Sequence, residues 1–164
     1  MNNLAKKLSL VFSAGSIGGL INSLAVWIFG VIGITSALGV KIAPSLSASW
    51  LYPRLVWGGI WGLLFLFPLM QKRYLYRGLI FSLGPTVVQL FIVFPIKASK
   101  GIMGLDLGLL TPLLVFVFNA IWGFAAAIWL RWVSETPRLK RQGLLNNLEG
   151  DCIPYNPAPH LSSP

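Results

Sequence analysis

Four long apolar stretches without any charged residue alternate with short basic segments along this chain of 164 residues. The uncharged stretches cover residues 8–40, 55–71, 78–96 and 107–130. A helix rises 1.5 Å per residue, so about 20 residues cross a hydrocarbon core of about 30 Å. The pattern therefore predicts an all-α membrane protein with four transmembrane helices in a small bundle, at about 8–33, 51–70, 77–96 and 109–130.

The second predicted helix has the least regular pattern, because Pro53 and Arg54 lie near its start. A helix that begins at Leu55 is short, whereas one that begins at Trp50 puts an arginine at the membrane boundary. Such an arginine is expected to lay its stem along apolar surface and to reach the lipid headgroups.

The composition agrees with one membrane domain followed by a tail. With 55% hydrophobic and 10% charged residues, the chain cannot cover a soluble globule with polar surface. Residues 1–132 are predicted to form the transmembrane domain, and 133–164 a polar cytoplasmic tail. A short helix at about 139–148 is expected in this tail, with disorder after it.

The net charge of +9 is distributed unevenly between the two predicted sides of the membrane. With four crossings, nine Lys and Arg residues lie on the side of both termini, and four lie on the other side. The positive-inside rule then predicts a multi-pass protein of a bacterial-type inner membrane with both termini in the cytoplasm. We expect these charges to contact anionic lipid headgroups, and no nucleic acid.

The first helix also resembles a signal peptide, because Lys6 and Lys7 precede an apolar run. That run continues to Val40, which is long for a signal core, so we expect an uncleaved helix. Cleavage after Ser23-Leu24-Ala25 is the alternative.

Small residues recur at intervals of four in the predicted helices, which is typical of close helix–helix packing. The candidate packing residues are Gly15, Gly19, Gly58, Gly62 and Gly123. This spacing fits contacts inside one bundle, and it equally fits a homo-oligomer or a larger membrane complex.

Three side-chain amides form a candidate intramembrane polar cluster: Asn22, Gln89 and Asn119. Asn22 lies roughly 21 Å from one helix end, and the other two lie roughly 15 Å from theirs, so all three can meet near the bilayer centre. They either bond to one another between helices or line a path for a solute.

The basic residues near the helix ends are candidate contacts for lipid headgroups or other anions. These candidates are Arg54, Lys72, Arg73, Arg77, Lys97 and Lys100. On the predicted outer side, Arg54, Lys97 and Lys100 can join Lys41 in a basic mouth that attracts anions.

Residues for catalysis or cofactor binding are scarce in the predicted spans, which contain no Asp, Glu or His. The single cysteine and the single histidine are Cys152 and His160, both in the tail. We therefore expect no enzyme activity, no cofactor and no metal site.

Several short motifs between residues 78 and 130 resemble the YagU-like inner-membrane proteins of bacteria. They are Gly78-Leu79-Ile80, Gln89-Leu90-Phe91, Phe94-Pro95, Met103-Gly104-Leu105 and Thr111-Pro112, with an aromatic helix from Phe116 to Trp129. The resemblance implies a multi-span inner-membrane protein without an established catalytic activity. The histidines that this family carries in its last two helices are absent from this chain.

The sequence leaves two hypotheses about function. The first is an accessory, assembly or scaffold subunit that acts through helix packing at its glycine faces. The alternative is a homo-oligomeric channel or facilitator for a small solute or anion, with Asn22, Gln89 and Asn119 facing the pore.

Overall fold

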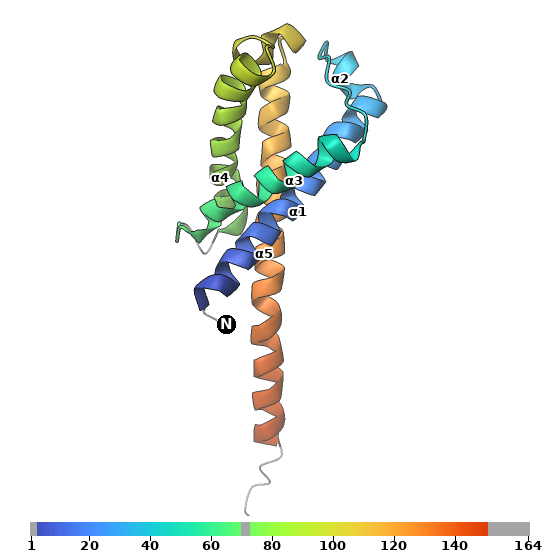
Figure 1. The fold of residues 1–164 in the computed structure, drawn as a ribbon. Coiled ribbons are helices and arrows are strands. Elements are labelled where there is room, and N and C mark those ends of the chain that lie inside the picture. Colours follow the sequence, from blue (N-terminus) through green and yellow to red (C-terminus); the bar gives the residue numbers. More distant parts are fainter. Residues whose placement is uncertain (1–2, 70–72, 151–164) are drawn as a thin grey trace, which may run out of the picture. The chain divides into compact units, whose positions relative to one another are not determined.

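The computed structural model describes residues 3–69 and 73–150, and side-chain surroundings only as far as residue 134. Every regular element in this part of the chain is helical (Figure 1). Two elements are 3₁₀ turns (η1 and η3) and one is a π-helix (η2). In chain order, the elements are α1 (Asn3–Val31), α2 (Ile34–Ala37), α3 (Ala48–Gly62), η1 (Leu63–Leu66), α4 (Tyr74–Val88), η2 (Gln89–Lys97), η3 (Ile102–Leu107) and α5 (Thr111–Gly150).

Three helices are long and apolar enough to span a membrane: Asn3–Val31, Tyr74–Lys97 and Thr111–Ser134. The second predicted span is not one long α-helix. It consists of the 15 residues of α3 and the four residues of η1. Phe67 is extended, with ψ of 129°, because the proline that follows it disfavours helical backbone. The prediction of a helix to residue 70 was therefore too long.

The glycines of α1 and α3 face one another in antiparallel register. A Cβ atom added to Gly58 would lie 2.7 Å from the backbone oxygen of Gly15 and 3.0 Å from the Cα of Gly19. One added to Gly62 would lie 2.9 Å from the Cα of Gly15. The two helices can approach so closely only because neither has side chains along this line.

The first part of α5 packs against both α4 and α1 through small residues. Gly78 of α4 lies against Gly123, and Gly18 of α1 lies against Trp122. The Trp122 side chain is only 2% exposed, and its indole N–H donates to the backbone oxygen of Gly15 at 2.9 Å. All five candidate packing glycines thus lie against other helices of the same chain.

The helix that begins as α4 widens at Gln89 into the π-helix η2, which contains Pro95. The Ala98 N–H donates to the Val93 carbonyl, five residues earlier, at 2.9 Å. Proline lacks an N–H and its ring clashes with the carbonyl four residues before it, so a wider turn accommodates it. This stretch carries Gln89 and Phe94, which both line the cavity described below.

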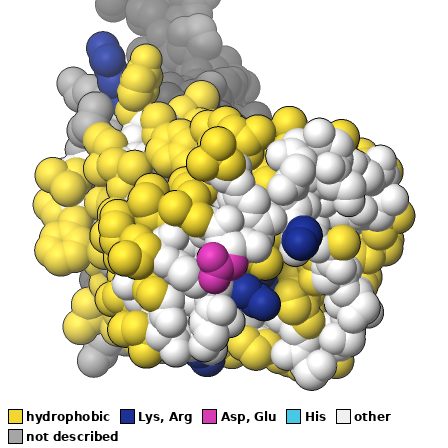
Figure 2. All heavy atoms as spheres, turned by 90° about the horizontal axis from the view of Figure 1, so that it is seen from above, with side chains coloured by type: hydrophobic (Ala, Val, Ile, Leu, Met, Phe, Trp, Pro, Cys, Tyr) yellow, Lys and Arg dark blue, Asp and Glu magenta, His cyan; other side chains and the backbone are white. Residues whose placement is uncertain are grey.

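Two connections meet at one end of the helices, which we call the loop end: residues 38–47 after α2, and 98–110 around η3. The Lys41 N–H donates to the Leu107 carbonyl at 2.8 Å, and Gly39 lies against Gly108. Gly108 has a φ of 143°, a backbone conformation that glycine adopts readily and other residues rarely do. Figure 2 looks onto this end, where basic and acidic side chains lie close together on a largely apolar face.

The last helix, α5, continues to Gly150 through residues 133–150 of the predicted tail. Leu, Lys, Arg and Gln are frequent there and are strong helix formers. The chain divides into two compact units between Arg131 and Trp132. The predicted disorder after 150, with Cys152 and His160, lies outside the described residues.

Candidate functional site

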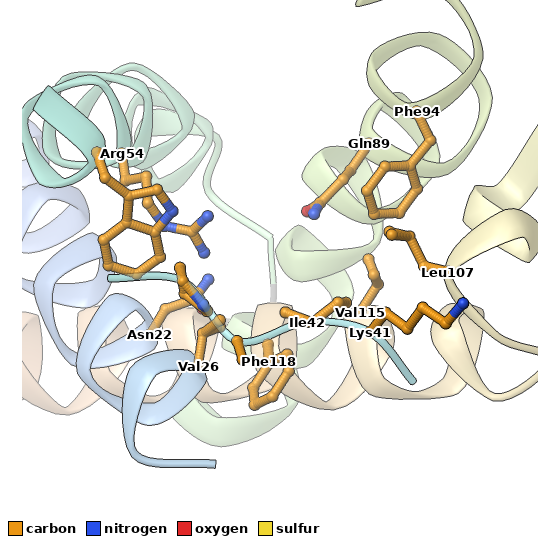
Figure 3. A pocket seen from close by; sticks show the side chains of 13 residues that line it. Asn22, Val26, Lys41, Ile42, Arg54, Gln89, Phe94, Leu107, Val115 and Phe118 are labelled. Atoms are coloured by element: carbon orange, nitrogen blue, oxygen red, sulfur yellow. The ribbon is translucent and has the colours of Figure 1, made fainter. Parts of the chain in front are cut away.

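A partly open cavity of about 340 Å³ lies among α1, α3, η2, α5 and the connections of the loop end (Figure 3). Its apolar wall combines aromatic and aliphatic side chains. This wall includes Val26, Ile42, Trp50, Phe94, Leu107, Val115 and Phe118. Its polar side chains are Asn22, Lys41, Arg54 and Gln89. The cavity therefore has two cations and two amides on a mainly apolar wall.

Arg54 is positioned by the register of the glycines. On α1, Ser23 follows Gly19 by four residues, and on α3, Arg54 precedes Gly58 by four. The antiparallel pairing that joins Gly19 to Gly58 consequently brings Arg54 opposite Ser23. The Arg54 Nε–H donates to the Ser23 Oγ at 3.0 Å, and this hydroxyl donates to the Gly19 carbonyl at 2.7 Å.

A second contact fixes the plane of the Arg54 guanidinium. It stacks on the indole ring of Trp50, one turn earlier on α3, at 4.5 Å from the ring centroid. Such a cation–π contact is favourable by about 0.5–2 kcal/mol. Held by Ser23 and Trp50, the guanidinium directs its two terminal nitrogens toward the cavity (Figure 3).

No carboxylate in the described part of the chain forms an ion pair with Arg54. Asp106 is the only acidic residue among those with described side chains, and it lies beside Gly101 in the loop around η3. The charge of Arg54 is consequently not neutralised by any of these residues. Arg54 is half-buried, and a cation that is partly removed from water without a paired anion is costly.

Gln89 faces Arg54 from the opposite wall of the cavity (Figure 3). Its Oε1 accepts a hydrogen bond of 3.3 Å from the Nδ2 of Asn119. The Nε2 of Gln89 carries two hydrogens that can donate to another group. Asn119, which is buried and does not line the cavity, thus sets the orientation of the amide that does.

Asn22 rises from α1 beneath Arg54 and has a buried oxygen, Oδ1, without a hydrogen-bond partner. An unpaired buried acceptor costs about 1–3 kcal/mol, and this oxygen can be satisfied only by a hydrogen-bond donor. Of the predicted amide cluster, Gln89 and Asn119 are bonded to each other, whereas Asn22 joins Gln89 only as part of the cavity wall.

The predicted basic contacts have different surroundings. Of the predicted basic mouth, Lys41 and Arg54 line one cavity, whereas Lys97 and Lys100 are exposed and lie outside its lining. In Figure 3, the Lys41 ammonium extends to the side of the cavity away from Arg54.

The other predicted basic contacts lie near the opposite end of the helices. Arg77 donates from Nη2 to the carbonyls of Phe65 and of Phe67, the latter at 2.8 Å, and Arg73 stacks on Tyr76. Lys72 lies outside the described residues.

Sequence reasoning missed Ser23 and Trp50 as parts of this site. The spacing of the sequence could have identified both. Two series of residues recur at intervals of four: Trp50, Arg54, Gly58 and Gly62 in one, and Gly15, Gly19 and Ser23 in the other. Aligning the two series in antiparallel order pairs Ser23 with Arg54.

Within the described residues, no group of three or more His, Cys, Asp or Glu side chains is placed to hold a metal ion. The donors at the cavity are instead N–H groups, which suit an anion. The chain matches no family model, no curated protein and no solved structure, so the resemblance to YagU-like proteins stays an expectation.

Proposed function

We propose that this protein is a facilitator of the bacterial-type inner membrane that binds a small anion in the cavity beneath Arg54. The observation that carries the proposal is an arginine inside an apolar bundle, with its terminal nitrogens toward a cavity and with no carboxylate partner among the described residues. An anion in the cavity would neutralise that charge, and Gln89 would donate to it from the opposite wall.

A comparison with Arg77 supports a binding role for Arg54. Arginines at membrane depth usually pair with carbonyls or anions, or face a water-filled cavity. Arg77 follows the first pattern, because it donates to two backbone carbonyls near η1 and lies over the rings of Phe65 and Phe81. Arg54 follows the second pattern, with one hydroxyl partner and an open cavity.

We further propose that α3 and η1 together form a fourth crossing, with both termini on the cytoplasmic side. An α-helix of 15 residues and a 3₁₀ turn of four span about 30 Å, close to the hydrocarbon thickness. The antiparallel register with α1 supports this topology. The Lys41–Leu107 hydrogen bond also supports it, since it holds together the two connections that would lie outside.

The glycine faces that suggested an accessory or scaffold function do not support it, because they are covered within the chain. Gly15, Gly19, Gly58 and Gly62 are covered by contacts between α1 and α3, and Gly123 is covered by Gly78. A partner helix would have to separate these pairs in order to reach them. A scaffold role would therefore need another surface of the chain.

Anion efflux from liposomes containing the purified protein tests the proposed function. Vesicles of zwitterionic lipid are loaded with a mixture of chloride, phosphate and small carboxylates, and the loss of each anion is followed after dilution. We expect Arg54→Gln to slow the protein-dependent efflux of at least one anion by about tenfold or more, because a charge-assisted hydrogen bond is lost.

Lys100→Gln is the matched control for this experiment, since it removes a positive charge at the same end of the helices but outside the cavity lining. It should leave efflux within about twofold of the unmodified protein. Equal efflux through the unmodified protein and the Arg54→Gln variant, for every anion, would refute the proposed function.

A further inference from the structure

We infer that the ligand of this cavity is a small monocarboxylate with an apolar body, rather than a phosphate or a lipid headgroup. The inference rests on the proposed function and adds the chemical class of the anion. It derives from three features of the cavity: the geometry of its donors, the apolar character of its wall and its size.

The donors match a single planar carboxylate. The Nε of Arg54 is occupied by Ser23, which leaves the edge formed by the two terminal nitrogens for the ligand. Two parallel N–H groups on such an edge match the two oxygens of a carboxylate. Stacking on Trp50 holds this edge in one plane, so the Arg54 side chain loses little conformational entropy when the ligand binds.

The opposite wall offers one further donor group, the Nε2 of Gln89, which Asn119 orients through the Gln89 oxygen. Asn119 is thus a positioning residue. A phosphate group has more oxygens and up to two charges, and the Arg54 edge with the Gln89 amide would leave part of it unpaired. The Lys41 ammonium lines the same cavity but extends to the side away from Arg54 (Figure 3). Burial of unpaired charged oxygens is strongly unfavourable, so the site should reject phosphate.

The remainder of the cavity suits an apolar body. Val26, Phe94, Val115 and Phe118 come from three different helical elements and lie around the same space. A volume of about 340 Å³ is at the lower limit of ligand pockets, which hold about 300–1,000 Å³. Aromatic or short aliphatic acids fit this description, whereas a long fatty acid would extend beyond the cavity.

Binding to the full chain in nanodiscs of zwitterionic lipid tests the inference without any substitution. Isothermal titration compares benzoate with benzamide, which has the same shape without the charge, and with inorganic phosphate. We expect benzoate to bind at least tenfold more tightly than either. A series from butyrate through octanoate to palmitate should bind most tightly at a short chain.

Three variants assign the binding to this cavity. Arg54→Lys keeps the charge but loses the paired donors and should weaken benzoate binding about ten- to hundredfold. Asn119→Leu releases the Gln89 amide and should weaken benzoate binding severalfold. Lys100→Gln should leave it unchanged. If Arg54→Lys fails to fold, the comparison of ligands on the unmodified chain still decides the inference.

The outcomes distinguish this inference from the proposed function. Phosphate binding that equals benzoate binding and depends on Arg54 would overturn the carboxylate assignment and leave anion binding intact. Loss of benzoate binding in nanodiscs with phosphatidylglycerol would identify a lipid headgroup as the occupant and overturn it as well. Affinity that rises through palmitate would overturn the assignment to a small solute. Failure of every anion to bind, together with efflux that does not depend on Arg54, would overturn both proposals.

Discussion

At the scale of single residues, the two arginines inside the helices have different consequences for stability. Arg77 donates to the carbonyls of Phe65 and Phe67, where the helical hydrogen-bond ladder ends. Arg54 has one hydroxyl partner, and Ser23 retains its bond to Gly19 without it. Arg77 thus pairs with the backbone, whereas Arg54 has its terminal nitrogens without a carbonyl or carboxylate partner among the described residues.

We expect Arg77→Met to destabilise the protein by about 1–3 kcal/mol, because the carbonyl of buried Phe65 loses its donor. Arg54→Met should change the stability in the absence of ligand by less than Arg77→Met, since removing a half-buried charge offsets the loss of the Ser23 and Trp50 contacts. Denaturation in mild detergent measures both. Equal losses for the two variants would contradict the assignment of Arg54 to ligand binding.

One part of the site, the pair of amides, could be predicted from the sequence. The amide pair of Gln89 and Asn119 follows from their depth in the predicted helices, and one of the two suggested roles, bonding between helices, is what joins them. The cavity was not predictable, because it depends on the path of residues 38–47, which brings Lys41 and Ile42 to its wall. No periodicity in that segment specifies its path.

At the scale of elements, the close approach of α1 and α3 depends on positions that tolerate no side chain. Gly58→Ala should destabilise the protein by about 1–3 kcal/mol, because its Cβ would meet the backbone of Gly15 and Gly19. Gly84→Ala is the control, since its Cβ would meet only side-chain atoms of Trp61 and Leu64. It should be neutral or slightly stabilising, as alanine favours the helix.

Thermal unfolding of both variants in the same detergent gives this comparison. A loss in Gly84→Ala as large as that in Gly58→Ala would show that glycine packing between α1 and α3 is not what limits stability.

The helical class and three of the long apolar elements follow from hydropathy, but the form of two elements does not. Pro68 ends the second predicted span early, by forcing Phe67 out of helical backbone. Pro95 lies in a π-helix, which the apolar pattern of residues 78–96 does not indicate. In both places, a proline and its local neighbours override the apolar pattern.

At the scale of the whole molecule, the number of crossings decides on which side of the membrane each connection lies. If α3 with η1 crosses, Ser45 and Lys100 share one side, and Asn3 and Arg73 share the other. If α3 does not cross, Ser45 and Arg73 lie on the same side. We expect the first arrangement, because α3 runs antiparallel to α1.

Single cysteines at these four positions, introduced together with Cys152→Ser, test this topology in intact cells. A thiol reagent that does not cross the membrane should label Ser45→Cys and Lys100→Cys from outside. It should label Asn3→Cys and Arg73→Cys only after lysis. Labelling of Arg73→Cys together with Ser45→Cys in intact cells would rule out a fourth crossing.

The unequal lengths of α1 and α3 have a mechanical consequence for the surrounding bilayer. By rise per residue, the 29 residues of α1 extend about 44 Å, whereas α3 and η1 together extend about 30 Å. If both segments cross the bilayer, they cannot both match one hydrocarbon thickness while upright, so α1 either tilts or extends beyond the hydrocarbon core at its Lys6–Lys7 end. Together, α3 and η1 are only just long enough to cross the hydrocarbon core. We therefore expect the protein to favour thin membranes, because a thicker membrane would strain the segment that carries Arg54.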